Sequence, residues 1–259
     1  MLAIKFKPLP NNLKKFVISL KDKKKRKESG LFIAEGYKIC YELYQSEYPA
    51  EFVVLDSAAK ETTLELAKKF YNRGIEVYIA RHSQYVQMCE TESPQDILVI
   101  ARLEKESRKL AFPIIVLDGI SDPGNFGTIL RTADWFGIKN VVTSHDSVEK
   151  FNPKVIRGSM GSFFRVNVLQ KENLVDFLLK LKDNCKIFAA VPNATRNLED
   201  IVFPYKSILI FGNEAKGISP IVLELADEHF KIEGAGRTDS LNLAISVGIV
   251  LYKFFLQNK

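Results

Sequence analysis

The sequence has few cysteines and histidines and no long apolar run. Its three cysteines and three histidines are scattered over 259 residues, so neither a disulfide framework nor a zinc site is predicted. No apolar run approaches the ~20 residues of a membrane-spanning helix. The opening stretch MLAIKFKPLPNN lacks the apolar core and cleavage site of a signal peptide. We therefore expect a cytoplasmic protein with no metal and no membrane contact.

Positive charge is concentrated at the N-terminus. Residues 1–27 hold ten Lys and Arg against one Asp, a local charge of +9 in a chain of +6, which leaves −3 for the remainder. Most of the excess lies in residues 21–27, KDKKKRK. Such a run is often only a solvated helix. Its strength and isolation favour contact with the phosphate groups of a nucleic acid.

The hydrophobic pattern alternates between strands and helices in two blocks, which predicts two α/β domains, 1–105 and 112–259. A charged stretch, 103–109, followed by Pro113, reads as the linker between them. The predicted strands of the first block lie at 31–34, 52–55, 75–79 and 97–101, and its helices at 11–27, 35–44, 60–72 and 83–88. Those of the second block lie near 114, 141, 166, 187, 208 and 230–232, with helices near 128–136, 152–160, 174–182, 220–225 and 241–257.

The loop after the strand at 114–117 carries the first candidate site. Its glycines are not spaced as G-x-G-x-x-G and no Walker lysine follows, so neither a dinucleotide nor a P-loop site is indicated. What stands out is Asn125-x-Gly127-x-x-x-Arg131. Helical side chains tilt toward the helix N-terminus, so Arg131 is expected to point back at a loop containing Asn125. A plainer interpretation is an exposed arginine beside a loop-capping Asn.

Two later loops have a similar character. The strand near 208 runs into Gly212-Asn213-Glu214-Ala215-Lys216-Gly217, which suits a ligand with hydroxyl or amino groups, or is an ordinary turn with Glu214 in solvent. In the third loop, Ser240 is expected to cap the helix at 241–256. Asn242 would then lie in the first turn of a buried helix, where its amide needs partners.

Together the three loops resemble the motifs of the SpoU-type (TrmH-like) RNA 2′-O-ribose methyltransferases of the SPOUT superfamily. The order N-x-G-x-x-x-R, G-N-E-x-x-G and S-L-N carries the likeness, with Ala133, Gly137 and the segment Asn152-Pro153…Arg157-Gly158-Ser159-x-Gly161 in further agreement. The stretch Arg26-x-x-x-Gly30-x-Phe32-x-x-Glu35-Gly36 is similar to the substrate-binding domain often fused ahead of the catalytic domain.

The resemblance implies more than the pattern does. Periodicity alone predicts a doubly wound sheet, since knots are nearly absent from proteins. The family implies a C-terminal trefoil-knotted α/β domain preceded by a small α/β RNA-binding domain, and a homodimer with active sites at the subunit interface. It also implies transfer of a methyl group from S-adenosylmethionine to a ribose 2′-hydroxyl of RNA, without a metal.

The resemblance also assigns roles to residues. Those implied in catalysis are Asn125, Arg131, Glu214, Ser240 and Asn242, and those implied in cofactor binding are Gly212, Asn213, Gly217, Ile232, Leu241 and Asn242. Arg131 is the family's proposed base. A guanidinium hardly deprotonates, so we expect Arg131, together with an RNA phosphate, to lower the hydroxyl pKa and stabilise the developing alkoxide.

One departure from the family bears on the cofactor. The usual Ile-Pro-Met-like segment before the third motif is here Lys231-Ile232-Glu233-Gly234-Ala235-Gly236-Arg237, which puts the adenine wall and the cofactor affinity in question. The N-terminal domain favours ribosomal RNA as substrate over transfer RNA. The alternatives are a tRNA 2′-O-methyltransferase, a non-catalytic RNA-binding or ribosome-assembly protein of the same fold, and a nicotinamide-dependent oxidoreductase, which the missing fingerprint disfavours.

Overall fold

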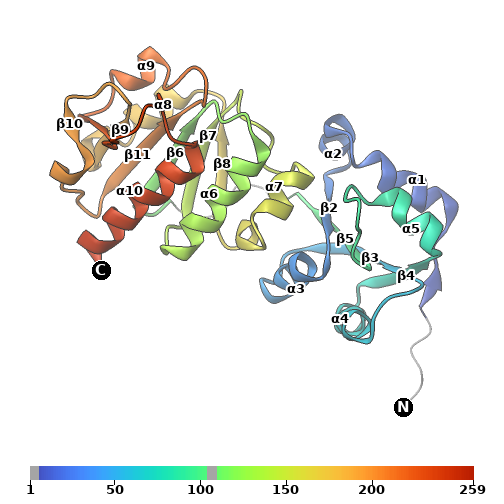
Figure 1. Cartoon of the computed structure of the whole chain (residues 1–259). Coiled ribbons are helices and arrows are strands. Elements are labelled where there is room, and N and C mark those ends of the chain that lie inside the picture. Colours follow the sequence, from blue (N-terminus) through green and yellow to red (C-terminus); the bar gives the residue numbers. More distant parts are fainter. Residues whose placement is uncertain (1–5, 104–109) are drawn as a thin grey trace. The chain divides into compact units, whose positions relative to one another are not determined.

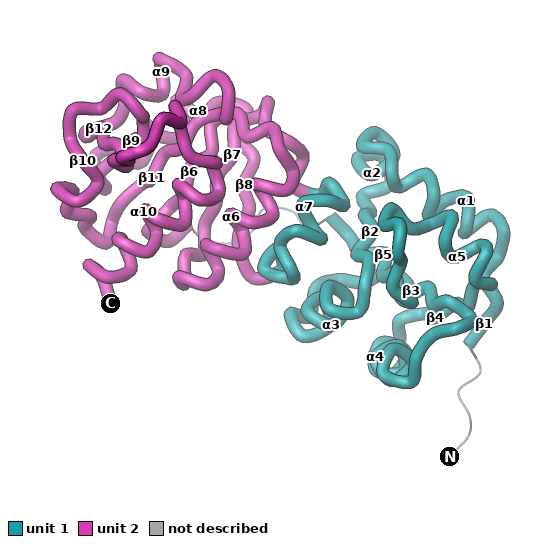
Figure 2. The backbone as a smooth tube through the Cα atoms, viewed as in Figure 1, with its two compact units in different colours: residues 1–105, 151–164 teal, residues 106–150, 165–259 magenta. Residues whose placement is uncertain are grey.

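A computed structural model describes residues 6–103 and 110–259 (Figure 1). The chain forms two compact units, one of residues 1–105 with 151–164 and one of residues 106–150 with 165–259 (Figure 2). Of the predicted linker, residues 104–109 lie outside the described residues. The segment 151–164 packs with the first unit, although its sequence pattern resembles the methyltransferase family.

The first unit contains a five-stranded sheet and the helices that pack against it. Its strand order is β1-β4-β3-β5-β2, and β5 runs antiparallel to both its neighbours. The strands are β1 Lys7–Pro8, β2 Leu31–Glu35, β3 Ala50–Asp56, β4 Glu76–Ala80 and β5 Ile97–Arg102. The helices are α1 Asn11–Ser19, α2 Lys23–Ser29, α3 Tyr37–Gln45, α4 Glu61–Asn72, α5 His82–Met88 and α7 Pro153–Gly158, with a 3-10 turn at Ser162–Phe164. Val17 of α1 and Tyr85 of α5 share one core cluster with Val54 of β3.

The single basic helix predicted at 11–27 is wrong: two helices occupy this stretch. The chain turns after α1, and the Asp22 carboxylate starts α2 by accepting hydrogen bonds from the backbone N–H groups of Lys24 at 2.8 Å and Lys25 at 3.1 Å. Capping by a side-chain oxygen satisfies donors that the helix itself leaves free. The one acidic residue of the basic stretch therefore sets the start of a separate helix.

The second unit is an all-parallel sheet of seven strands in the order β10-β12-β9-β11-β6-β7-β8. Its strands are β6 Ile114–Asp118, β7 Asn140–Ser144, β8 Asn167–Lys171, β9 Lys186–Ala190, β10 Arg196–Asn197, β11 Ser207–Gly212 and β12 Glu228–Lys231. Its helices are α6 Pro123–Trp135, α8 Leu174–Leu179, α9 Pro220–Leu223 and α10 Leu243–Asn258, with 3-10 turns at Lys182–Asn184 and Leu198–Asp200. This confirms the predicted α/β class with a parallel sheet.

Helices cover both faces of this sheet, which explains why its strands are continuous apolar runs. Helices α6 and α10 pack side by side on one face (Figure 1). Alternate residues of the central strands, such as Ile114, Val116 and Ile208, join Leu178 of α8 and Val222 of α9 in the core of the other face. None of the helices within residues 6–103 and 110–259 is long and apolar enough to cross a bilayer.

Two helix starts differ from the prediction. Helix α6 begins at Pro123, five residues earlier than expected, because Asp122 caps it by accepting the Asn125 N–H at 2.6 Å and proline fits the first helical position. Asn125 is therefore a helical residue. Helix α10 begins at Leu243 with Asn242 as its N-cap, so the predicted cap at Ser240 is wrong.

A candidate active site at the carboxyl ends of the parallel strands

A pocket of about 970 Å³ opens where strands β9, β11 and β12 end. Loops at this edge of a parallel sheet are where ligands bind in open α/β folds. The pocket is lined by residues 190–192, 211–217, 230–234, 236, 238–243, 246 and 249. All six residues that the family resemblance implies in cofactor binding lie in this lining, and so do Glu214 and Ser240.

The loop after β11, which lines the pocket, depends on a close backbone approach at Gly212. The loop after β11 folds back so that Asn213 and Gly217 exchange both backbone hydrogen bonds at 2.9 Å. A Cβ placed on Gly212 would lie 2.1 Å from the carbonyl carbon of Gly217 and 2.2 Å from the nitrogen of Ile218. A side chain at this position would displace the loop, so the close approach requires glycine.

The same loop is tied to the ends of neighbouring strands. The Asn213 amide donates to the Gly119 carbonyl oxygen at 2.6 Å, and its oxygen accepts the N–H groups of Ala215 and Lys216. The Asp118 carboxylate accepts both the N–H and the hydroxyl of Ser219, at 2.8 and 2.7 Å. The polar atoms of Asn213 are thus bonded within the protein, so we assign to it the positioning of the loop.

Sequence reasoning missed Asp118 and Ser219, because their pairing joins positions 101 residues apart. The only signal available was the polar residue at the end of each apolar strand.

A directed chain of hydrogen bonds joins the three loops. The Asn242 oxygen caps α10, accepting from the Ala244 N–H at 2.9 Å, so its amide nitrogen donates to the Asn125 oxygen, also at 2.9 Å. The Asn125 nitrogen in turn donates to Glu214 Oε1 at 2.9 Å. Glu214 Oε2 accepts the Ser121 hydroxyl at 3.0 Å. Because the cap fixes the first amide, the orientation of every later group follows.

This chain favours the ionised form of the Glu214 carboxylate. Burial by itself raises the Glu214 pKa, but hydrogen bonds from Asn125, from its own backbone and from Ser121 outweigh it and lower the pKa below its usual value. A carboxylate that is already bonded and whose pKa is lowered is a poor proton acceptor near neutral pH. The geometry favours a role for Glu214 in holding Asn125.

Two of the residues implied in catalysis stand apart from this chain. Arg131 is exposed on α6, six residues beyond Asn125, and within the described part of the protein its guanidinium makes no hydrogen bond or ion pair. Six helical residues correspond to ~9 Å of rise between Asn125 and Arg131. Ser240 lines the pocket and is exposed.

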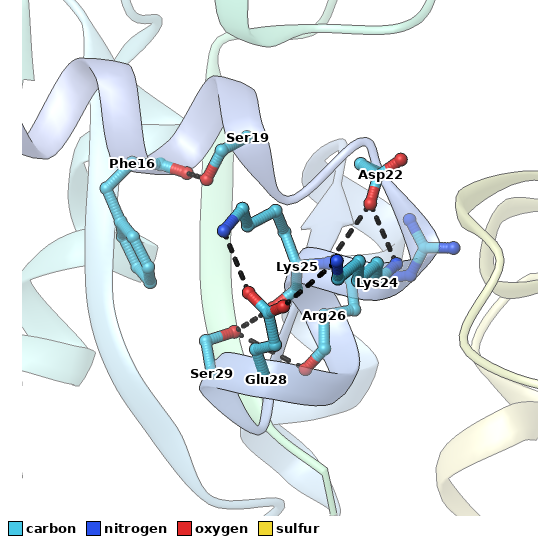
Figure 3. A network of polar contacts seen from close by, with 8 residues as sticks. All are labelled: Phe16, Ser19, Asp22, Lys24, Lys25, Arg26, Glu28 and Ser29. Carbon is cyan, nitrogen blue, oxygen red and sulfur yellow. Dashed lines mark hydrogen bonds and ion pairs between the residues drawn. The ribbon is translucent and has the colours of Figure 1, made fainter.

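Two cations of the predicted phosphate-binding run are structural. The Arg26 side chain is buried, and its Nη1 donates to the carbonyl oxygens of Leu20 at 2.9 Å and Lys21 at 2.8 Å. Lys21 donates to the carbonyl oxygens of Gln87 and Cys89. Figure 3 shows how Asp22, Lys25 and Glu28 fix the helix that carries Arg26. The four other lysines of the run, at positions 23, 24, 25 and 27, are exposed, and of these Lys25 is ion-paired with Glu28 at 2.8 Å.

The rest of the N-terminal signature is structural as well. The Phe32 ring packs against Phe151, with ring centroids 5.1 Å apart. The buried Glu35 carboxylate accepts the Glu90 N–H at 3.0 Å and the Thr91 hydroxyl. Gly36 has a φ of 98°, and a Cβ there would lie 2.9 Å from Gln95 Oε1. These contacts give Phe32, Glu35 and Gly36 a structural role within the first unit.

No group of three or more His, Cys, Asp or Glu side chains in the described ranges could hold a metal ion. S-adenosylmethionine needs no metal for binding, and the pocket offers it apolar walls, backbone groups and carboxylates.

Comparisons with known proteins agree with the resemblance seen in the sequence. Residues 113–252 match the SpoU rRNA Methylase family, and residues 11–99 match the MRM3-like substrate binding domain. The chain is 29% identical to the 23S rRNA (guanosine(2553)-2′-O)-methyltransferase RlmP of Bacillus subtilis, over 90% of this chain and 92% of that protein. It is 31% identical to an uncharacterized tRNA/rRNA methyltransferase of Synechocystis, over 94% and 90%.

Among solved structures, the AdoMet-bound rRNA methyltransferase from Sinorhizobium meliloti is 26% identical to this chain. The superposition has a TM-score of 0.84 and covers 95% of each chain.

Proposed function

The chain belongs to the SpoU rRNA methylase family, and we propose that it transfers a methyl group from S-adenosylmethionine to a ribose 2′-hydroxyl of ribosomal RNA. The observation that carries the proposal is the hydrogen-bond chain Asn242–Asn125–Glu214 at the mouth of the pocket. It joins the three family motifs into one site, and relatives with these activities match nearly the whole chain.

The pocket fits S-adenosylmethionine in size and chemistry. Its volume of about 970 Å³ is at the upper end of the ~300–1,000 Å³ range of small-molecule sites. Apolar residues such as Ile232 and Leu241 line the pocket and can cover an adenine ring, and Gly212 and Gly217 belong to the same lining. When bound, the cofactor supplies an electrophilic methyl group on a sulfonium sulfur.

The chain's own residues then have separate tasks. Asn125, held between Asn242 and Glu214, is fixed at the edge of the pocket where the methyl acceptor would enter. Arg131 lies further along α6 with a free and exposed guanidinium. We assign to it the binding of an RNA phosphate and the stabilisation of the negative charge that develops on the 2′-oxygen as the hydroxyl proton passes to that phosphate or to water. Ser240 would contact the donor side of the pocket.

The two domains divide the work. Residues 1–105 would bind the RNA, chiefly through the four exposed lysines of α2, and residues 112–259 would carry out the transfer. The family models for these two parts, at 11–99 and 113–252, support this division. The combination with a substrate-binding domain and the likeness to a 23S rRNA enzyme favour ribosomal over transfer RNA.

We also propose a homodimer formed through α6 and α10. One side of α10 carries four exposed apolar residues at helical spacing, Ile245, Ile249, Tyr252 and Leu256. An apolar stripe of this kind marks an interaction surface. On the neighbouring α6, Trp135 is 84% exposed and lies one turn beyond Arg131. Covering the stripe with a second copy would place Arg131 near the interface.

The single tryptophan makes the dimer testable. If Trp135 becomes covered, its emission shifts to the red as the protein is diluted, and sedimentation shows the dimer dissociating over the same range. An Ile249→Glu variant is expected to be monomeric with red-shifted emission at all concentrations. A wild-type protein that sediments as a monomer at high concentration would contradict the proposal.

Two further properties of the family complete the proposal. Strand β12 is separated from β6 by β9 and β11, yet α10, the helix that follows β12, packs on α6, the helix that follows β6, and we propose that the chain between β12 and α10 forms the family's trefoil knot. An experimental structure whose chain closes without a knot would contradict it. We place the protein in the cytoplasm, where its ribosomal substrate is assembled, and a fluorescent fusion would locate it.

The activity is tested with labelled S-adenosylmethionine and purified RNA. Methylation of ribosomal RNA from cells lacking the gene, followed by mapping of 2′-O-methyl positions, identifies the modified nucleotide. Label entering only transfer RNA would move the function to the tRNA alternative. A protein that binds RNA but neither binds the cofactor nor transfers its methyl group would be a non-catalytic member of the family.

A further inference from the structure

The departure from the family pattern before the third motif gives the pocket a carboxylate. Glu233 follows strand β12 by two residues and lines the pocket. It stands in the segment where the family usually has Ile-Pro-Met. A proline there would offer no side-chain acceptor, whereas a glutamate offers two oxygens. A carboxylate in this position is either free in solvent or held by a hydrogen bond from the protein.

A residue of the neighbouring edge strand, β10, holds the Glu233 carboxylate in place. The Asn197 amide nitrogen donates to Glu233 Oε2 at 2.6 Å. Asn197 belongs to β10, which pairs in parallel with β12 so that Asn197 lies opposite Lys231, two residues before Glu233. Strand pairing therefore fixes the donor beside the acceptor.

The edge strand is itself anchored by charge. Glu228 of β12 forms ion pairs with Lys186 of β9 and with Arg196 of β10, the residue before Asn197. The Arg196 guanidinium also donates to the Asp200 carbonyl oxygen at 2.9 Å. A two-residue strand at a sheet edge would otherwise have little to hold it. These contacts fix the position of Asn197 and, through it, of Glu233.

With Oε2 bonded to Asn197, the second oxygen of Glu233 has no hydrogen-bond partner among the described residues, and the residue is exposed in the pocket lining. Its place in the sheet indicates which part of a ligand it would meet. Glu214, on the loop after β11, is joined to Asn125 at the reacting side. Glu233 follows β12, which is separated from β11 by β9, so the two loops start roughly 10 Å apart. An adenosine extended away from the reacting sulfur spans such a gap.

We propose that Glu233, oriented by Asn197, accepts a hydrogen bond from the adenosine half of S-adenosylmethionine, from either a ribose hydroxyl or the adenine amino group. This rests on the proposed function and assigns to Glu233 a part in cofactor affinity. The carboxylate supplies specific recognition in a wall segment that lacks the family's proline. Asn197 is a positioning residue, which acts on the cofactor through Glu233.

Calorimetric titration with S-adenosylmethionine, S-adenosylhomocysteine and adenosine tests the proposal without an activity assay. Loss of a charge-assisted hydrogen bond in Glu233→Ala should weaken all three ligands by about tenfold. All three share the adenosine. Glu233→Gln keeps an acceptor oxygen and should lose less. The matched control is Glu224→Ala, which removes an exposed acid outside the pocket lining and should bind as the wild type does.

Asn197→Ala separates recognition from loop tethering. It breaks the same 2.6 Å hydrogen bond but leaves the carboxylate in place, so its loss of affinity should be smaller than that of Glu233→Ala. Titrating the wild type and Glu233→Ala with 2′-deoxyadenosine, 3′-deoxyadenosine and inosine identifies which group of the adenosine donates to Glu233. The analogue that lacks this group should bind the two proteins with equal affinity.

Three results would overturn the proposal: an unchanged affinity in Glu233→Ala, a loss confined to the charged S-adenosylmethionine, or an equal loss in Asn197→Ala. A wild-type protein that binds no S-adenosylmethionine would instead count against the proposed function. Thermal unfolding of each variant checks that the unit remains folded.

Discussion

Asn242 is the residue at which helix capping and site assembly can be separated by substitution. Its oxygen caps α10, and its nitrogen donates to Asn125 at 2.9 Å. Asn242→Asp keeps a capping oxygen and adds negative charge at a helix N-terminus, which stabilises by ~0.3–1 kcal/mol. It replaces the donated hydrogen by a second oxygen, so two acceptors then face each other. Rotating the Asn125 amide would only move the mismatch to Glu214.

Three variants therefore behave differently in stability and alike in activity. Asn242→Ala should lose ~1 kcal/mol of unfolding free energy, the usual value of a cap. Asn242→Ser keeps a capping oxygen and should lose little unfolding free energy, whereas Asn242→Asp should gain ~0.3–1 kcal/mol. All three should slow single-turnover methylation at saturating cofactor and RNA by about ten- to a hundredfold, because a displaced Asn125 misplaces the reacting groups.

The assay pairs thermal unfolding with single-turnover kinetics, since Asn242 also lines the pocket and its loss would affect binding. The double variant Asn125→Ala/Asn242→Ala should be no slower than the slower single variant, as expected for residues that act through one contact. If Asn242→Asp or Asn242→Ser turned over at the wild-type rate, the hydrogen-bond chain would have no part in catalysis. Additive effects in the double variant would lead to the same conclusion.

Three further predictions concern the basic helix, Glu214 and Arg131. Replacing the lysines at positions 23, 24, 25 and 27 with Gln should weaken RNA binding and make it less dependent on salt. The slope of log binding constant against log salt concentration should fall by roughly 0.7–0.9 for each RNA phosphate that the variant no longer neutralises. Arg26→Gln should instead lower the stability of its unit, and an unchanged salt slope in the lysine variant would show that the run is only solvated. Glu214→Ala should reduce methyl transfer while changing the unfolding free energy by no more than about 1 kcal/mol. The pKa of Glu214 is lowered in the folded protein. Its carboxylate therefore stabilises the fold above the unfolded pKa, and this effect is lost as the pH falls through the folded pKa. The unfolding free energy of Glu214→Ala should accordingly fall less with decreasing pH than that of the wild type. Arg131→Ala should slow single-turnover methylation by on the order of a hundredfold or more and Arg131→Lys should restore little, with cofactor titrations unchanged in both; near-normal turnover in Arg131→Ala would exclude it from the chemistry.

The sequence alone determined the class of the fold and pointed to the loops that form the candidate site. Buried parallel strands are continuous apolar runs, so 114–117 and 207–211 could be found without knowledge of their neighbours. Turn-forming residues after each run marked the loops that form the pocket. The order of three short motifs then identified the family, which the comparisons confirmed. These are local signals, in which a residue's neighbours in the chain are also its neighbours in space.

Tertiary structure decided which of those residues touch. Asn242 and Asn125 are 117 residues apart in the chain, and Glu233 meets Asn197 across 36. No periodicity encodes such a pairing. The same limit explains the errors: Arg26 and Lys21 looked like phosphate ligands until the fold supplied carbonyl oxygens for them. The chemistry of a side chain fixes which groups it can bind. Whether a group within the protein already binds it is determined only by the packing of distant segments.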